Sequence, residues 1–400
     1  MPNASKTFLL TGGRSSSTLD IARQLHSAGH RVLSADTKRW HVCKFSNAVS
    51  KNFLIPSPRF ETAKFIEKLV KITTEEKVDI LIPTYEEILY LSKYLDRFPA
   101  SCHVFSSTFE TLHRLHNKWL FYCRQRELGI PTPKTYLVRS YEELKQLPFE
   151  QPYILKASYS RSSQSLFKIK GKESLPKIEF SKQNPWLAQE WLDGKKYCTY
   201  SVCQNGNVTA HATYPVHFTI DGNSCVCFEA VDHPKILEWV KYFAARENFT
   251  GQAGFDFFEM SNGQLYAIEC NPRATNGLLL FQPSDRLDRA FILPNQKTIQ
   301  PHTGYKKQLI AGMLLYAWKI AYKDRNFSNF LKALFTTRDV IFNKKDLKPF
   351  FWQPFIFCSY LYQKLKAKLS LPAWFTFDCN WDGEETGTHT EECTKITERS

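Results

Sequence analysis

The sequence predicts a chain of α/β and α+β structure with a helical C-terminal part, and three observations lead to this prediction. In residues 1–115, short apolar runs alternate with amphipathic stretches, which is the pattern of a parallel sheet with connecting helices. Between residues 197 and 271, apolar runs are joined by turn dipeptides, which is typical of antiparallel strands. Residues 306–322 and 326–335, and the stretch that follows Lys348 and ends near residue 369, show helical patterns. At 400 residues, the chain is long enough for two to three domains.

The N-terminal part predicts three strands connected by two helices. We expect the strands at 7–10, 31–36 and 79–83, and the helices at 18–28 and 60–76. The turn after the first strand lacks the G-x-G-x-x-G fingerprint of dinucleotide sites, because Gly12 and Gly13 are adjacent. Asp36, at the end of the second strand, is weak support for such a site. We therefore expect a Rossmann-like domain that helps to shape a substrate cleft and binds no dinucleotide.

Two acids follow the third predicted strand, at the carboxyl end where open α/β sheets bind ligands. Glu86 and Glu87 lie just beyond residue 83. Contact with an amine substrate is one interpretation of these carboxylates. We favour a role at the start of a helix, where a negative charge is stabilised by the helix dipole.

The segment 251–273 contains a cluster of oxygen side chains. It reads as two strands joined at a tight Asn262 and Gly263 turn. Asp256 ends one apolar run, and Glu269 and Asn271 end the other on one face of their strand, since strand side chains alternate. Two carboxylates and an amide suit Mg²⁺, with Mn²⁺ as an alternative. A surface hairpin with ordinary polar residues is the less favoured interpretation.

Several polar residues upstream stand in apolar or aromatic surroundings. Lys118 opens a predicted helix that ends at the Gly-Ile-Pro-Thr-Pro run of 129–133. Lys156 lies inside the apolar strand 153–158, where a lysine needs an anionic partner or a route to water. The run 186–194 contains, in order, Gln189, Glu190, Trp191 and Leu192. For Trp191 and Leu192, packing in the protein core and contact with a ligand are equally favoured interpretations.

In order and spacing, these motifs resemble the ATP-grasp superfamily, of carbamoyl-phosphate-synthase-like or carboxylate–amine ligase type. The resemblance covers roughly residues 5–283. It implies that Lys118 and Lys156 bind the ATP phosphates and that Lys156 is also catalytic. It further implies that Gln189 and Glu190 lie at the adenine, with Trp191 and Leu192 packed on its ring. The implied metal ligands are Asp256, Glu269 and Asn271, and Arg273 is implied to orient the acceptor carboxylate.

The chain departs from the family pattern in two places. The loop after Lys156, residues 159–165, carries serines and Arg161 where the family has glycines over the triphosphate. Lys196 stands where the family often has a ribose-binding Glu. Serine hydroxyls, backbone N–H groups and Arg161 are the phosphate-binding groups that this loop still offers.

The resemblance implies a ligase that activates a small-molecule carboxylate as an acyl phosphate, which an amine then attacks. One alternative is a carboxylase-like or kinase-like enzyme that uses the same ATP site. Another is a non-catalytic ATP-binding regulator that associates with a membrane surface or a partner protein. The substrates and the oligomeric state are not predicted by the sequence.

The net charge of +14 is uneven along the chain. Residues 301–372 hold thirteen Lys and Arg against three Asp, with several aromatic residues between them. Peripheral contact with an anionic membrane through 301–372 is one interpretation. We favour a helical appendage whose aromatic residues pack on the rest of the protein. No nucleic-acid-binding motif is present, and we expect no nucleic acid partner.

Location and domain boundaries complete the predictions. The eleven cysteines show no metal-binding spacing, and no segment is apolar enough to span a membrane. We therefore expect a cytoplasmic protein, peripheral on the inner face of a membrane if 301–372 binds lipid. The predicted parts are a Rossmann-like domain at 1–115, an ATP-grasp domain at 116–300, a basic helical appendage at 301–375 and an acidic, disordered tail at 376–400.

Overall fold

The structure is a computed structural model that divides into two compact units. It describes residues 5–149, 152–160, 166–170, 175–220, 224–323, 325–367 and 371–383. Unit 1 comprises Met1–Phe109, Thr199–Gly254 and Arg273–Asn380, and unit 2 comprises Glu110–Cys198, Phe255–Pro272 and Trp381–Ser400. The boundaries at 115, 300 and 375 that we expect from the sequence stay predictions.

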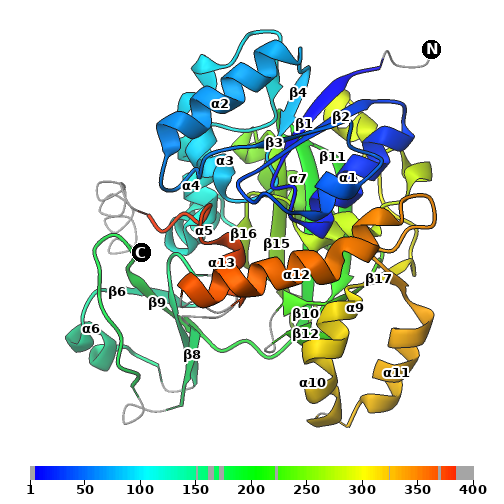
Figure 1. The fold of residues 1–400 in the computed structure, drawn as a ribbon. Coiled ribbons are helices and arrows are strands. Elements are labelled where there is room, and N and C mark those ends of the chain that lie inside the picture. The colour runs from blue at the N-terminus through cyan, green and yellow to red at the C-terminus, as the bar shows by residue number, and fades with distance from the viewer. Residues whose placement is uncertain are drawn as a thin grey trace. The chain divides into compact units, whose positions relative to one another are not determined.

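A five-stranded parallel sheet begins unit 1. Its order is β3-β2-β1-β4-β5, and all neighbouring strands run parallel. The strands are β1 (Thr7–Thr11), β2 (Arg31–Asp36), β3 (Lys51–Leu54), β4 (Ile80–Ile82) and β5 (His103–Val104). Helices α1 (Ser16–Ser27) and α2 (Thr62–Glu75) alternate with them (Figure 1). The α/β fold predicted for this part is confirmed.

The turn between β1 and α1 is shaped by the contacts around Gly12. This residue has φ of +69°, and a Cβ there would lie 2.5 Å from Thr84 Oγ1. Only glycine adopts this positive φ without strain and also leaves room for the Thr84 side chain. The side chain of Ser15 then caps α1 by accepting from the backbone N–H of Ser17. The remaining elements of this part are η1 (Val42–Phe45), α3 (Glu87–Leu91) and η2 (Ser92–Arg97), and α4 (Phe109–His116) begins the first segment of unit 2.

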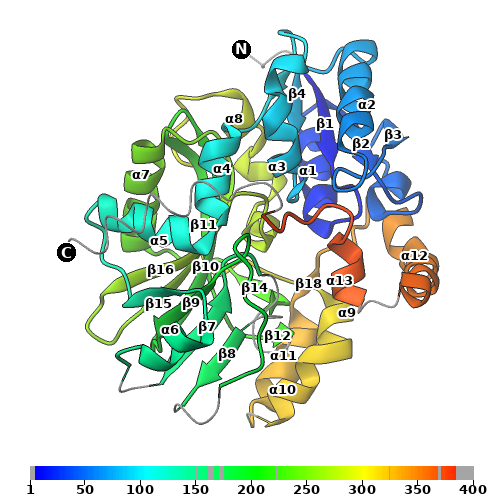
Figure 2. The same ribbon diagram turned by 90° about the vertical axis from the view of Figure 1, so that its left-hand side faces the viewer.

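Unit 2 contains an antiparallel sheet of order β6-β9-β7-β8, of which β7, β8 and β9 are labelled in Figure 2. Its strands are β6 (Thr135–Val138), β7 (Tyr153–Ala157), β8 (Leu166–Ile169) and β9 (Trp186–Glu190). Helices α5 (Lys118–Glu127) and α6 (Tyr141–Gln146) belong to the same unit. One face of the sheet is covered by its own apolar cluster, which includes Val138, Leu144, Leu155 and Ala188.

A second four-stranded sheet has the order β11-β10-β15-β16. Its strands are β10 (Lys195–Gln204), β11 (Asn207–Pro215), β15 (Gly251–Glu259) and β16 (Leu265–Asn271). The predicted tight turn joins β15 and β16. Gly263 has φ of +79°, and its N–H donates to the Met260 carbonyl. This hairpin positions the predicted metal ligands.

The C-terminal part of unit 1 is helical but also contributes strands, contrary to the purely helical appendage that we expected at 301–375. Strands β17 (Lys306–Gln308) and β18 (Arg338–Asp339) pair in the order β14-β17-β18, where β14 is Cys227–Glu229. The extended segment around β17 forms because its backbone groups pair with those of β14. Helices α10 (Trp318–Lys323), α11 (Phe327–Thr336), α12 (Lys348–Ala367) and α13 (Leu371–Thr376) follow.

Eight further elements belong to the described chain. They are β12 (Thr219–Ile220), β13 (Ser224–Cys225), α7 (Pro234–Glu247), η4 (Asn276–Leu280), η5 (Pro283–Asp285), α8 (Asp288–Ile292), α9 (Ile310–Gly312) and a π-helical turn at Met313–Ala317. None of the helices that the structure describes is long and apolar enough to cross a membrane.

The end of the chain differs from the solvated tail that we expected from residue 376 onward. The structure describes this segment as far as residue 383, and Asp378 and Cys379 are buried. Their burial depends on an arginine far away in the sequence, described below. Residues 384–400 lie outside the described residues.

Candidate active site

Lys118 is the first residue of α5 and is buried. Asn117 fixes this helix start, because its side-chain oxygen accepts from the N–H groups of Trp119 and Leu120, at 2.9 and 3.1 Å. The Lys118 Nζ donates to the Ser160 carbonyl at 3.1 Å and lies 3.6 Å from the carboxylate of Glu269. The ammonium group of Lys118 therefore contacts two segments that are distant in sequence, one at Ser160 and one at Glu269.

Lys156 is a buried cation on β7. Its Nζ donates to Gln189 Oε1 at 3.0 Å and to the Ile268 carbonyl at 3.2 Å. Burial lowers its pKa to about 8, and the neighbouring Lys118 acts in the same direction, whereas Glu269 and Asp256 raise the pKa. Two ammonium groups that repel each other inside unit 2 form a site where an anion is strongly favoured.

The predicted metal ligands lie on the β15–β16 hairpin. Asp256 is on β15, whereas Glu269 and Asn271 are on β16, and all three are half-buried. Cys270, between the last two, is buried on the opposite face of the strand. Asp256 and Glu269 both act on the charge of Lys156, so the carboxylates and the ammonium groups are neighbours, as the sequence led us to expect.

The donor set fits a hard divalent cation bound together with phosphate. The described residues contain no group of three or more His, Cys, Asp or Glu side chains that could hold a metal ion. A cation at Asp256 and Glu269 would therefore take its other oxygens from Asn271, water and phosphate. Mg²⁺ is bound in this way, through one or two carboxylates and the substrate's phosphates.

Gln189 and Glu190, two residues of the predicted adenine site, have different hydrogen-bond partners. Gln189 is buried, and its Nε2 donates to Thr135 Oγ1 at 2.9 Å while its Oε1 accepts from Lys156. The Glu190 carboxylate accepts from the backbone N–H of Lys134 at 2.8 Å. Gln189 therefore orients Lys156, which sequence reasoning missed. Its adenine contact, and that of Glu190, stay predictions.

Trp191 and Leu192 differ in exposure. Leu192 is buried, whereas Trp191 is 41% exposed. The Nζ of Lys168 lies 3.3 Å from the centre of the Trp191 ring, a cation–π contact. Packing of the two side chains on adenine stays a prediction. Arg161, in the loop that we expect to cover the triphosphate, lies outside the described residues, as do 162–165.

Arg273 belongs to unit 1 and has a buried acidic neighbour there. Its Nε lies 3.8 Å from a carboxylate oxygen of Glu86, and its Nη1 donates to the Ala274 carbonyl at 3.2 Å. Glu86 is thus a second acid near the predicted carboxylate-binding arginine. Sequence reasoning had no signal for this pair, because 187 positions separate the two residues.

Glu87 has the helix-start role that we favoured. Its carboxylate accepts from the N–H groups of Thr84 and Tyr85, at 3.0 and 3.1 Å, and from the hydroxyl of Thr11. Burial raises its pKa, and these hydrogen bonds oppose that shift. The side chain is therefore committed to the start of α3.

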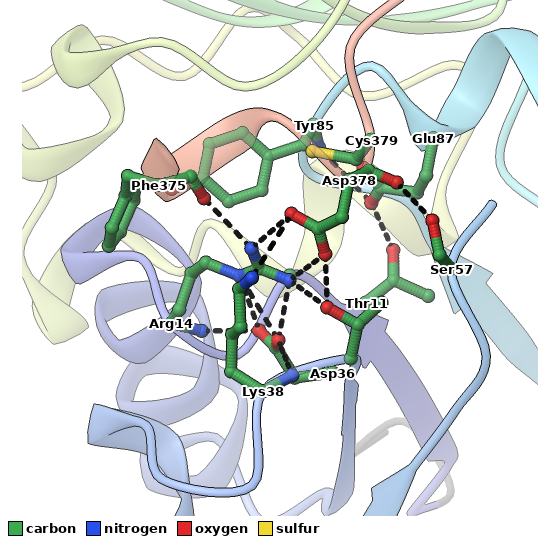
Figure 3. A network of polar contacts seen from close by, with 12 residues as sticks. Thr11, Arg14, Asp36, Lys38, Ser57, Tyr85, Glu87, Phe375, Asp378 and Cys379 are labelled. Carbon is green, nitrogen blue, oxygen red and sulfur yellow. Dashed lines mark hydrogen bonds and ion pairs between the residues drawn. The ribbon is translucent and has the colours of Figure 1, made fainter. Parts of the chain in front are cut away.

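Asp36, the weak indication of a dinucleotide site, is engaged within the protein. Its carboxylate accepts from the backbone N, Nε and Nη2 of Arg14 and from the Lys38 N–H. Arg14 also donates to both carboxylate oxygens of Asp378, at 2.8 and 2.9 Å (Figure 3). A carboxylate with these partners is a poor acceptor for a ribose hydroxyl, which supports our expectation that no dinucleotide binds here.

Comparison with known proteins identifies a domain model that matches part of the chain. Residues 115–277 match the family model described as an ATP-grasp domain. The structure of N5-carboxyaminoimidazole synthetase from Staphylococcus aureus superposes with a TM-score of 0.58 at 14% identity, covering 80% of this chain and 86% of that one. An identity this low shows a shared fold.

Two curated relatives match parts of the sequence. The arginine-specific large chain of carbamoyl phosphate synthase from Bacillus subtilis is 22% identical over 269 residues, which are 62% of this chain and 26% of that protein. The coenzyme gamma-F420-2:alpha-L-glutamate ligase of Methanococcus maripaludis is 29% identical over 119 residues, 28% of this chain and 41% of that protein. The chain therefore matches less than half the length of either relative.

Proposed function

We propose that the chain is a Mg-ATP-dependent ligase that joins a carboxylate to an amine, because residues 115–277 match the model of an ATP-grasp domain. In the first step a carboxylate oxygen of the substrate attacks the γ-phosphorus of ATP, so that an acyl phosphate forms and ADP leaves. In the second step an amine attacks the acyl carbon, and phosphate leaves as the C–N bond forms.

The observation that carries this proposal is the grouping of two buried ammonium groups with two carboxylates inside unit 2. Lys118 lies 3.6 Å from Glu269, and Lys156 is influenced by Lys118, Glu269 and Asp256 together. A triphosphate between these groups would satisfy both cations at once. Because phosphoryl transfer depends mainly on positioning and charge stabilisation, fixed cations of this kind supply much of what the reaction needs.

Magnesium is part of the proposal, and Asp256, Glu269 and Asn271 would hold it. Bound there, Mg²⁺ would neutralise charge on the phosphate oxygens during transfer. Gln189 holds the ammonium of Lys156 through a 3.0 Å hydrogen bond, so that Lys156 meets the phosphates in a fixed orientation. Mn²⁺ offers the same oxygen preference.

Arg273 is proposed to bind the acceptor carboxylate. A guanidinium can grip a carboxylate with two parallel hydrogen bonds, and Glu86 beside it would limit the orientations that Arg273 adopts. The same group would stabilise the oxyanion when the amine attacks. Loss of one such donor typically costs about 3–4 kcal/mol in the barrier.

We expect Lys156→Met and Glu269→Gln each to abolish ATP turnover while the fold is retained. Each removes a charge of the four-residue group without adding bulk. Lys71→Met and Glu75→Gln, at an exposed pair on α2, are the matched controls and should keep activity. Phosphate release measures turnover, and circular dichroism with thermal melting measures the fold. Full activity in either site variant would contradict the proposed roles.

Hydroxylamine distinguishes a ligase from an enzyme that ends at a stable phosphorylated product. The purified chain is screened for phosphate release with ATP, Mg²⁺ and pooled amino acids and short carboxylates. With the active carboxylate, hydroxylamine should replace the amine and yield a hydroxamate, because it attacks an acyl phosphate. Turnover without hydroxamate would favour the kinase-like alternative. Mg-ATP binding without turnover on any pool would favour a non-catalytic regulator.

The cytoplasm is the proposed location. All ten cysteines that lie in the described residues are free thiols. Free thiols are usual in reducing compartments. ATP, the proposed substrate, is available there as well.

A further inference from the structure

Helix α12 has two apolar faces: one is packed within unit 1, and the other is exposed to solvent over most of its described side chains. Pro349, Ile356 and Tyr360 are buried, and they share the face that is packed within unit 1. This contact is fixed by a hydrogen bond from the Tyr360 hydroxyl to the Trp40 carbonyl at 2.8 Å. The ring of Trp352 also stacks on that of Phe45, with centroids 4.2 Å apart.

The opposite face carries a second apolar stripe that is exposed. Its members recur at intervals of four and three residues, which keeps them on one side of a helix. They are Phe351 (63% exposed), Phe355 (67%), Cys358 (exposed), Tyr362 (62%) and Leu365 (72%). We call these five residues the outer stripe. Helix α12, which contains it, is drawn along its length in Figure 1 and nearly end-on in Figure 2.

Single exposed apolar residues are normal on a protein, but a contiguous stripe is not. Among the described residues, 23 large apolar side chains are exposed, and sixteen of them lie between Leu314 and Phe377. This concentration in less than a fifth of the chain marks the segment as a contact surface. Our expectation that its aromatic residues pack on the protein holds for the inner face of α12 and for Phe330 of α11, which is buried in a core cluster, but not for the outer stripe.

The charge around the outer stripe is basic. Lys344, Lys345 and Lys348 are exposed at its N-terminal end, and the last turns of α12 contain Lys364 and Lys366. The acids nearby are turned inward: Asp346 accepts from Arg23 at 2.9 Å and from Ser46 at 2.6 Å. Asp339 accepts from three backbone N–H groups, those of Ile310, Ile341 and Phe342.

We propose that the outer stripe of α12 docks on an anionic lipid bilayer, with its aromatic and aliphatic side chains in the boundary between headgroups and acyl chains. A helix with apolar residues along one line and lysines at both ends is suited to that position. Trp40 and Trp352, which stack on each other within the packed contact, stay 37% and 39% exposed, and tryptophan side chains favour membrane interfaces.

A second copy of the chain is the less suitable occupant. Two outer stripes in contact would bring the flanking lysines of both copies together, and no exposed acid on α12 would compensate them. An anionic surface satisfies the apolar stripe and the basic flanks at once. The proposal does not depend on the proposed ligase function, because none of the residues of the candidate active site lies on α12.

The first test is vesicle co-sedimentation of the full chain, with phosphatidylcholine alone or mixed with phosphatidylserine. We expect sedimentation with the mixed vesicles and at least a tenfold loss of partitioning in Phe355→Ser/Leu365→Ser. Phe60→Ser, at a comparably exposed residue outside α12, should bind like the wild type. Equal recovery in the supernatant with and without mixed vesicles, or undiminished binding of the double variant, would overturn the proposal.

The second test places a probe in the stripe itself. Cys358 is the one exposed thiol among the described cysteines, so a fluorophore sensitive to polarity can be attached there in a Cys393→Ser background. Addition of mixed vesicles should shift its emission to the blue, as expected for transfer from water to lipid. A concentration-dependent dimer that Phe355→Ser/Leu365→Ser dissolves, with no shift on adding vesicles, would show instead that the stripe pairs with a second copy.

Discussion

At the scale of single residues, Lys156 was predictable and its partner was not. A lysine inside an apolar strand signals a bound anion from the sequence alone. Its contact with Gln189 depends on how β7 pairs with β9. Ile154 lies opposite Gln189, and Lys156 lies opposite Leu187, so Lys156 and Gln189 are diagonal neighbours on one face of the sheet. No local pattern in the sequence reveals that register.

The lowered pKa of Lys156 predicts proton uptake when ATP binds. Burial and Lys118 bring this pKa to about 8 in the free protein, whereas phosphate oxygens would favour the ammonium form and raise it again. Near pH 8, binding of Mg-ATP should therefore take up about half a proton, since half of the lysines are neutral at a pH equal to the pKa. Near pH 6.5, uptake at this residue should be close to zero.

Calorimetry measures this uptake directly. Titrations are run in two buffers that differ in ionisation enthalpy, and the difference in apparent binding enthalpy gives the number of protons exchanged. Lys156→Met, if it retains measurable affinity, should show no uptake at either pH. An uptake that is the same at both values of pH in the wild type would be inconsistent with a lysine titrating near 8.

At the scale of elements, the β15–β16 hairpin was predictable and the packing of the C-terminal segment was not. Asn262 and Gly263 mark the hairpin turn locally. The segment around Asp378 is held by Arg14, 364 positions away, and a sequence pattern does not show partners at such a separation. An acidic, Thr-rich composition beyond it suggested a solvated tail instead.

We predict that Asp378→Asn destabilises the protein by about 3–5 kcal/mol, because removal of one partner leaves the Arg14 charge buried and incompletely paired. The side chains of both residues are almost fully buried. The control is Glu75→Gln, which breaks an exposed pair with Lys71 and should cost at most about 0.5 kcal/mol. Urea unfolding gives both differences, and equal effects of the two substitutions would contradict the prediction.

The same pair predicts a dependence on pH. Burial raises the pKa of Asp378, but Arg14, Lys38 and Thr37 outweigh it and hold the pKa at about 2, below the ordinary value of 3.8. A carboxyl group whose pKa is lower in the folded state than in the unfolded state stabilises the fold. This stabilisation is fully present above the unfolded-state pKa and is lost as the pH falls through the folded-state pKa. The stability difference between wild type and Asp378→Asn should therefore be smaller at about pH 3 than at about pH 6.

At the scale of the whole molecule, the predicted fold class is confirmed, whereas the composition of the compact units was not foreseen. Unit 2 combines Glu110–Cys198 with the hairpin segment Phe255–Pro272. Sequence reasoning identified both pieces through Lys118, Lys156 and Glu269. It did not predict that the intervening residues Thr199–Gly254 belong to unit 1. The division into compact units depends on tertiary packing, which the local signals for strands and helices do not reveal.

This composition predicts where Mg-ATP protects the backbone from hydrogen exchange. The proposed phosphate and metal ligands, Lys118, Lys156, Asp256, Glu269 and Asn271, all belong to unit 2. A ligand at about a hundredfold excess over its dissociation constant stabilises the state that binds it by about 2.7 kcal/mol. Local opening of the bound elements should be suppressed accordingly, so that exchange slows in peptides from Glu110–Cys198 and Phe255–Pro272.

Peptides from the parallel sheet β1–β5 supply the internal control for this experiment. They carry none of the proposed ligands, and their exchange should change little when Mg-ATP is added. Glu269→Gln should lose protection in both segments of unit 2 together, because its carboxylate belongs to the hairpin while its partner Lys118 belongs to the other segment. Protection confined to β1–β5 would locate the nucleotide on the α/β sheet and would refute the assignment of the site to unit 2.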